Sequence, residues 1–313
     1  MLRYTIRRIL LLIPIILIVS FIVYLLMDLA PGSIVDNMIT ENMSQEDIAK
    51  LYEQYDMDKS VFYRYGKYML HFVQGDMGVS DYTGVSVYKT YMRAFPRTLI
   101  LALSGFFIGF IVAVPLGIFA ARHSGTIWDS TATLFSMLGL SVPNFWLGIQ
   151  LILLFSVKWG LLPAGGTSAG IAGLILPAIS GGFSMMGTCS RTVRSSMLDV
   201  LRADYLRTAR AKGVPEKNVI RKHALGNAWI PILTSFGSLL AINIAGSAVV
   251  ESVFNWPGVG QLLVSSVRQR DITLTTGCVI MTSILYTVIQ LLVDLAYAFV
   301  DPRIRSRFAK TLS

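Results

Sequence analysis

A basic helix–turn–helix pattern runs from Asp204 to Leu225. Gly213 stands where a first helix would end, and Arg210 and Lys212 precede it, where cations complement the helix dipole. Pro215 and Glu216 suit the first turn of a second helix. We therefore expect two short helices that form a rigid basic ridge. Such a ridge could bind anionic lipid, but lipid binding alone requires no glycine at a fixed spacing.

The motifs of nucleotide and catalytic chemistry are missing. The chain has no Gly-x4-Gly-Lys-Ser/Thr loop, no His-Glu-x-x-His and no Gly-x-Ser-x-Gly. His71, His123 and His223 fall in separate segments. Cys189 is expected at the inner end of the fourth span and Cys278 near the outer end of the sixth, so the bilayer core would hold them too far apart for a disulfide. We expect neither an enzyme nor a metal site, and no cofactor bound by this chain.

The composition is that of a membrane protein. Of 313 residues, 54% are hydrophobic and only 14% are charged, whereas soluble domains carry about 25% charged residues. This excludes a water-soluble enzyme, a coiled coil and a disordered chain. The net charge of +9 would suggest nucleic acid in a soluble protein. In a chain this apolar, the bilayer is the expected partner and nucleic acid is not.

Six stretches without charge are long enough to cross a bilayer core, which needs roughly 20 apolar residues. They are Ile9–Met27, Thr98–Ala121, Ser130–Val157, Leu161–Ser190, Ala224–Val250 and Ile272–Val293. The fourth begins in a glycine-rich run, so we expect its helix to start near Gly170. The sequence thus predicts an all-α integral membrane protein with six transmembrane helices.

The distribution of Lys and Arg between the spans predicts the orientation. One side holds 17 of these residues and the other holds 10. Seven of the 10 lie in one long segment, and long translocated segments count for little in the positive-inside rule. We therefore expect a multi-pass protein of the cytoplasmic membrane with both termini cytoplasmic. Residues 30–97 are then external, and residues 191–223, with 9 basic and 3 acidic residues, are cytoplasmic.

The external segment carries two helix signals. Ser44 with Asp47 resembles a capping box, and aromatic residues recur at helical spacing between Val61 and Phe72. We favour a small cap packed on the outer ends of the membrane helices. The alternative is a docking surface for an extracellular partner, since aromatic residues are enriched at interfaces.

A few residues within the spans suggest packing or a pathway. Gly105 and Gly109 form a small-x3-small pair, which is typical of close helix packing. Asn144 and Asn243 lie at membrane depth, where an amide must find a partner or face water. With Trp146, they are our candidates for lining a translocation pathway. The charge-free spans contain no mid-membrane carboxylate, which weakens the case for an ion-coupled carrier.

The basic ridge also carries a family resemblance. Arg207-Thr208-Ala209-x3-Gly213 is similar to the EAA loop of importer permeases in the ATP-binding cassette (ABC) superfamily, with Arg207 in place of the glutamate. The run Tyr205–Gly213, followed by Arg221–Ala228, looks like this loop in oligopeptide, dipeptide and nickel permeases. Further blocks resemble the B-type subunit of that group: Leu29–Gly32, Gly75–Ser80, Ser141–Gly148, Gly160–Gly166, Phe254–Gly260 and Asp301–Arg303.

The resemblance implies a type I ABC importer permease fold. Residues 1–93 would form an added helix and external segment, 94–300 the permease core, and 301–313 a cytoplasmic tail. It implies four kinds of partner: a second homologous permease in a heterodimer, two ABC ATPase subunits that hold ATP and Mg²⁺, an extracytoplasmic substrate-binding protein, and the bilayer. The residues that would couple to an ATPase are Arg207, Thr208, Ala209, Gly213, Val214, Glu216, His223 and Leu225.

The resemblance leaves three functions open. The first is ATP-driven import of short peptides, such as dipeptides and oligopeptides. The second is import of nickel or a metal chelate, which the scattered histidines do not favour. The third, from another class, is an ion-coupled secondary transporter that acts alone.

Overall fold

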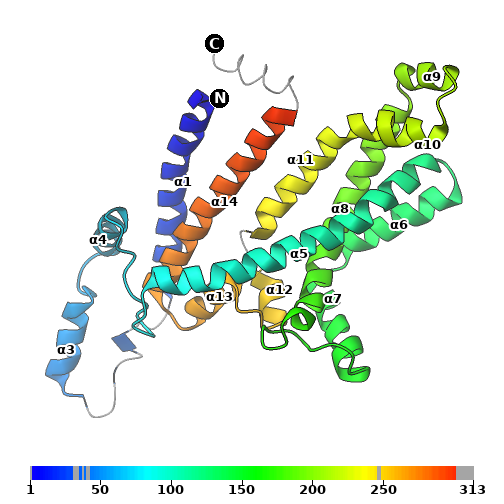
Figure 1. The fold of residues 1–313 in the computed structure, drawn as a ribbon. Coiled ribbons are helices and arrows are strands. Elements are labelled where there is room, and N and C mark those ends of the chain that lie inside the picture. The colour runs from blue at the N-terminus through cyan, green and yellow to red at the C-terminus, as the bar shows by residue number, and fades with distance from the viewer. Residues whose placement is uncertain (1, 31–34, 37–38, 40–42, 245–247, 301–313) are drawn as a thin grey trace.

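The structure, a computed structural model, describes residues 2–30, 35–36, 39, 43–244 and 248–300. Helices make up nearly all of the named elements within these residues (Figure 1). In chain order they are α1 (Leu2–Leu29), α3 (Gln45–Gln54), α4 (Val61–Val73), α5 (Val87–Arg122), α6 (Ile127–Ser141), α7 (Asn144–Leu151), the π-helix η1 (Ile152–Lys158), α8 (Ile171–Leu201), α9 (Asp204–Ala211), α10 (Glu216–Asn218), the π-helix η2 (Val219–Ala224), α11 (Leu225–Ile244), α12 (Ala248–Val253), α13 (Val259–Arg268) and α14 (Ile272–Val300). The expected tail, 301–313, lies outside the described residues.

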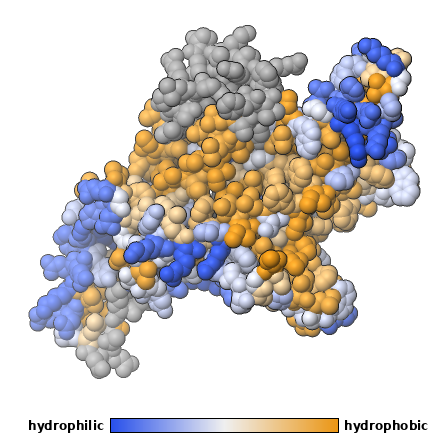
Figure 2. All heavy atoms as spheres, in the orientation of Figure 1, coloured by the Kyte–Doolittle hydropathy of each residue, from blue (hydrophilic) through white to orange (hydrophobic). Residues whose placement is uncertain are grey.

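Within the described residues, five helical spans are long and apolar enough to cross a membrane. They fall on α1, α5, α8, the continuous helix Glu216–Ile244 and α14. The expected start of the fourth span is confirmed, since α8 begins at Ile171 and Gly170 precedes it with φ +58°. An apolar belt crosses the visible face, and hydrophilic surface gathers on α9 and on α3 and α4 (Figures 1 and 2).

The third predicted span is not one straight helix. It is broken between α6 and α7, and the two halves, Ile127–Ser141 and Asn144–Lys158, are bent by 97°. Pro143 cannot donate a backbone hydrogen bond and forces Val142 out of the helical region, to φ −80° and ψ 119°. The count of six spans therefore holds only if this bent pair is one span.

Glycines bring α5 and α8 into close contact along much of their length. A Cβ on Gly182 would lie 2.7 Å from the Gly105 carbonyl oxygen, and one on Gly109 would lie 3.0 Å from the Gly182 carbonyl oxygen. A Cβ on Gly117 would lie 2.6 Å from the Ser190 carbonyl oxygen. The expected close packing of Gly105 and Gly109 is therefore confirmed, and α8 is the partner.

The external segment packs against α1. Ser44 caps α3 as expected, because its Oγ accepts a hydrogen bond from the Asp47 backbone N–H at 3.1 Å. Tyr65 of α4 packs edge-on against Phe21 of α1 with ring centroids 5.1 Å apart. Arg64 forms a half-buried ion pair with Asp28 at 2.7 Å. These contacts support the interpretation as a cap on the outer ends of the helices.

Two acidic residues fasten the external segment to the start of α14. Asp271 is fully buried and accepts hydrogen bonds from Ser80 Oγ at 2.5 Å and from the Leu274 backbone N–H at 2.8 Å. Asp81 accepts from the backbone N–H of Thr273 at 3.1 Å. Both carboxyl groups therefore lie at a helix N-terminus, where the dipole favours negative charge. Burial, with a smaller contribution from Asp271, raises the pKa of Asp81 from 3.8 to about 6.

We predict that exchanging the two adjacent glycines of α8 for alanine has opposite effects. Gly182→Ala forces a Cβ into the backbone of α5, and overpacking of this kind costs about 1–3 kcal/mol. Gly181→Ala is the matched control, because a Cβ at Gly181 meets no atom within 4 Å. The thermal midpoint of the purified protein in detergent should fall for the first variant and stay level or rise for the second. Equal midpoints would refute the contact.

We also predict that stability falls as the pH rises from about 4 to about 6. Over this interval the folded protein keeps the Asp81 proton that the unfolded chain releases, so raising the pH favours unfolding. Asp81→Asn should flatten this part of the stability curve, measured as the thermal midpoint at pH 4, 5, 6 and 7. Asp58→Asn, at an exposed carboxylate paired with Lys59, should leave the slope unchanged. A wild-type slope that survives Asp81→Asn would contradict the assignment.

Candidate functional site

The turn after α9 is a Schellman motif built around Gly213. The Gly213 backbone N–H donates to the Arg210 carbonyl oxygen at 2.9 Å, and the Val214 N–H donates to Ala209 at 3.2 Å. This pattern requires a left-handed residue after the helix end, and Gly213 has φ +78°. The predicted helix stop at Gly213 is therefore confirmed.

An ion pair closes the same turn. Arg210 in the last turn of α9 donates from Nε and Nη2 to the two carboxylate oxygens of Glu216, at 3.1 and 3.0 Å. Pro215 lies one position before the helix that Glu216 begins. Both side chains are solvent-exposed, so the pair orients the turn rather than adding much stability.

The prediction of a second short helix is wrong. The helix that begins at Glu216 runs without a break through η2 into α11, and Glu216–Ile244 is one span of 29 residues. The junction is the π-helix η2, whose wider turns are frequent at functional sites. Of the two short helices predicted for the ridge, only α9 is separate, so the ridge is α9 followed by the extended end of α11.

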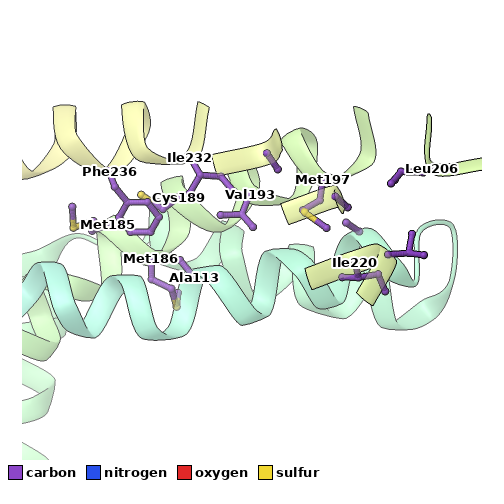
Figure 3. Close-up of a cluster of buried hydrophobic side chains, with 14 residues drawn as sticks. Ala113, Met185, Met186, Cys189, Val193, Met197, Leu206, Ile220, Ile232 and Phe236 are labelled. Atoms are coloured by element: carbon purple, nitrogen blue, oxygen red, sulfur yellow. The ribbon is translucent and has the colours of Figure 1, made fainter. Parts of the chain in front are cut away.

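One buried side chain anchors α9 to the membrane helices. Leu206 is fully buried and belongs to a cluster that includes Val193 and Met197 of α8 and Val219 and Ile220 of η2 (Figure 3). Ala209 and Val214, two of the predicted coupling residues, pack against the same cluster. Packed side chains therefore join α9 directly to α8 and to the helix that η2 and α11 form.

A hydrogen-bond bridge supplements this anchor. Asn227 of α11 donates from Nδ2 to the Tyr205 hydroxyl and to the His223 carbonyl oxygen, both at 3.0 Å. Tyr205, Leu206 and Asn227 were absent from the predicted coupling set, although all three belong to the sequence runs that carry the resemblance. The side chains of Arg207, Thr208 and His223 are exposed.

The pathway candidates lie in two places. Asn144 begins α7 directly after the break, and its carbonyl oxygen accepts from Ser180 Oγ of α8 at 2.9 Å. Asn243 donates to the Leu239 carbonyl oxygen at 2.9 Å, and it lines a small closed cavity with the neighbouring α8 residue Gly181. Both asparagines thus lie beside the same part of α8, whereas Trp146 is 50% exposed on α7.

Two polar contacts that the sequence pattern missed also lie along α8 and α5. Arg194 of α8 binds Asp129 of α6 through Nε and Nη2, each at 2.7 Å. Glu251 of α12 is fully buried and accepts from Thr98 Oγ1 of α5 at 2.7 Å. These residues fall at or just beyond the ends of charge-free stretches, so a search for uncharged spans passes over them.

A polar cavity of about 570 Å³ opens between α6 and α8. Its lining includes the α8 side chains Thr188, Arg191, Thr192 and Ser195, together with Thr133 of α6. Among the described residues no group of three His, Cys, Asp or Glu side chains is placed to hold a metal ion. The lining thus offers hydroxyl groups and the guanidinium group of Arg191, together with the apolar side chain of Leu140, whereas the charge of Arg194 is paired with Asp129.

This architecture and its sequence are similar to those of known transport proteins. The fold is similar to that of the MetNI methionine ABC transporter in inward-facing conformations, with a TM-score of 0.58 and 20% identity over 68% of this chain and 96% of that one. The chain is 38% identical to the oligopeptide transport system permease protein AppB of Bacillus subtilis, over 97% of this chain and 99% of the relative. It is 33% identical to the dipeptide transport system permease protein DppB of Escherichia coli K12, over 98% and 100%.

These similarities define a multi-pass permease subunit of an ABC importer, which resides in the plasma membrane and is not itself an enzyme. Residues 113–306 match the binding-protein-dependent transport system inner membrane component, and residues 1–102 match its N-terminal membrane component. The chain belongs to this family. Membership implies ATPase subunits, which carry ATP hydrolysis, and a substrate-binding protein as partners.

We predict that Gly213→Ala weakens the association with the ATPase subunits. Holding a non-glycine residue at the left-handed φ of +78° costs about 1–2 kcal/mol. This cost lowers the equilibrium ratio of the native turn to its disrupted forms by a factor of about 5 to 30. Gly213→Asn should be milder, because asparagine tolerates this region. The measurement is the amount of ATPase that copurifies with the tagged permease at increasing salt.

Gly66→Ala provides the matched control, because Gly66 lies in α4, outside the coupling region, and a Cβ there meets no atom within 4 Å. It should retain the ATPase like the wild type. Equal ATPase retention by the Gly213→Ala and Gly66→Ala variants would contradict a role for the turn.

Proposed function

We propose that this chain is a permease subunit of an ATP-driven importer of short peptides, such as dipeptides and oligopeptides. The observation that carries the proposal is α9, an exposed basic helix whose Leu206 is locked into the cytoplasmic ends of α8 and α11. It is built to convert the movement of a docked ATPase into movement of membrane helices. The names of the relatives AppB and DppB support peptides as the cargo.

The coupling surface in this proposal is the exposed side of α9 and its turn. Arg207, Thr208 and His223 are exposed, and Gly213 and Glu216 fix the turn. Ala209, Val214 and Leu225 face inward and pack against the buried cluster, which joins this surface to the membrane helices. ATP-driven closure of the ATPases would carry α9, α8 and α11 together between two arrangements, as a rigid-body switch.

We also propose a membrane orientation and a set of partner subunits for this chain. The N-terminal end of α1, the C-terminal end of α14 and α9 lie towards the same end of the molecule (Figure 1). This supports both termini on the cytoplasmic side, together with the excess of Lys and Arg there. A second homologous permease would form a heterodimer with this one, two ATPases would bind ATP and Mg²⁺, and this chain would bind no cofactor. Residues 1–93 would be a family-specific addition to a core of residues 94–300.

The pathway would follow the polar side of α8. The cavity lined by Arg191 and Thr192 lies on this helix, and Ser180 and Gly181 of the same helix adjoin Asn144 and Asn243. Hydroxyl and amide groups suit a peptide backbone, which is the same whatever the side chains are. Trp146, exposed on α7, would face the same route from its outer part.

The decisive experiment is reconstitution of the complete transporter in proteoliposomes. We expect uptake of a labelled tripeptide that depends on ATP and on the binding protein, and little uptake of nickel ions or a nickel chelate. Uptake of nickel in preference to peptide would replace the proposed cargo with a metal. Peptide uptake driven by an ion gradient without the ATPases would establish the secondary transporter instead.

A further inference from the structure

A second cavity lies between α5 and the helix formed by α10, η2 and α11. It measures about 660 Å³, within the range of small-molecule sites. Its polar lining consists of three cations, Arg122 of α5 with Lys217 and Arg221 of the facing helix, and its apolar lining includes Pro115, Ile118 and Phe119. We call it the basic pocket. The proposed coupling surface on α9 and the polar cavity between α6 and α8 do not include these cations.

The cations and the apolar residues are ordered along both walls. On α5 the apolar residues come first and Arg122 is the last residue of the helix. On the facing helix Lys217 and Arg221 come first and Leu225 follows. At 1.5 Å per residue, Arg122 is about 10 Å along the axis from Pro115. The basic pocket is therefore charged at its cytoplasmic end and apolar towards the bilayer.

None of the three cations forms an ion pair with a carboxylate of the part of the chain that the structure describes. The adjacent acid Glu216 is close enough for its carboxylate to interact with the charge of Arg122, but both of its oxygens are bonded to Arg210. Three like charges around one cavity repel each other unless an anion joins them. The missing component is therefore an anion with an apolar extension.

The geometry points to an anionic phospholipid of the inner leaflet as the occupant of the basic pocket, with its phosphate among Arg122, Lys217 and Arg221. The cytoplasmic leaflet is rich in anionic lipid, and basic pockets between membrane helices suit such headgroups. The pocket wall on α5 belongs to a membrane span whose other side chains, such as Ile111 at 67%, are exposed outward. An acyl chain can follow this wall into the bilayer, which a protein partner in the cytoplasm cannot do.

A lipid in this position would touch the joint of the coupling region. Ile220 lines the basic pocket and also belongs to the buried cluster around Leu206 of α9. It lies in the π-helix η2, the element that connects the turn to α11. The bound lipid would thus brace the joint through which α9 is carried by the membrane helices.

The test counts lipid on the purified transporter complex. The complex is equilibrated with equal amounts of phosphatidylglycerol and phosphatidylcholine, and the retained lipid is measured by native mass spectrometry. Three charge contacts correspond to an enrichment of phosphatidylglycerol of about a hundredfold at low salt. The variant Arg122→Gln/Lys217→Gln/Arg221→Gln should lose this enrichment. The matched control Arg202→Gln/Lys212→Gln/Lys222→Gln, which removes three other exposed cytoplasmic cations, should retain it.

A second variant keeps all three cations. Ile118→Trp fills the apolar part of the basic pocket and should also reduce the retained phosphatidylglycerol. Retention at the wild-type level in this variant would show that the acyl chain is not held there, and would overturn the assignment.

Four further outcomes would overturn the proposal. If the wild-type complex shows no enrichment of phosphatidylglycerol, the site does not exist. If the control variant loses as much phosphatidylglycerol as the pocket variant, the lipid is attracted by the general positive charge and not by the pocket. Displacement of the lipid by inorganic phosphate at millimolar concentration marks a free-anion site. Release of the ATPase subunits from the pocket variant marks a protein contact. Because the readout is bound lipid and not uptake, a negative result leaves the proposed transport function untouched.

Discussion

The close approach of α5 and α8 is the contact on which the rest of the structure depends. Inside a bilayer, lipid tails are as apolar as leucine, so burying apolar side chains contributes little to the association of helices. The favourable free energy of association must come from close backbone packing instead. Gly105, Gly109 and Gly182 allow this approach, and Gly117 extends it towards the C-terminal end of α5. Because α8 continues beyond the packed region to Leu201, the same contact sets where α9 begins.

The coupling region follows from this arrangement by packing rather than by charge. The basic residues of α9 are exposed and their ion pairs are of the surface kind, which contribute little to stability. What holds the helix is the fully buried Leu206 in its cluster with α8 and η2 (Figure 3). This division leaves the charged side of α9 exposed while its apolar side joins the helix to the spans, which is the arrangement that the proposed rigid-body switch needs.

The sequence predicts those parts of the fold that depend on local rules. Charge-free length located the spans, the left-handed glycine located the end of α9, and Ser44 located the start of α3. Proline shows where local rules end. Pro115, Pro177 and Pro231 remain inside helices, whereas Pro143 separates α6 from α7 by a sharp bend. The residue type is the same in all four, so neighbouring helices decide the outcome. The pairing of Asp129 with Arg194, 65 residues apart, is equally invisible to a local pattern.

The buried carboxylate of Glu251 tests the choice between an importer and an ion-coupled carrier. A carrier needs a carboxylate that can release and rebind a proton or cation during transport. In Glu251 one oxygen accepts from Thr98 Oγ1 and the other from the Gln261 backbone N–H at 2.9 Å, and Thr98 Oγ1 in turn accepts from the Val259 N–H. These donors belong to α5 and to the first turn of α13, so the carboxylate ties two elements together and caps a helix. A carboxylate held by both oxygens in this way has a structural role, which favours the proposed importer over an ion-coupled carrier.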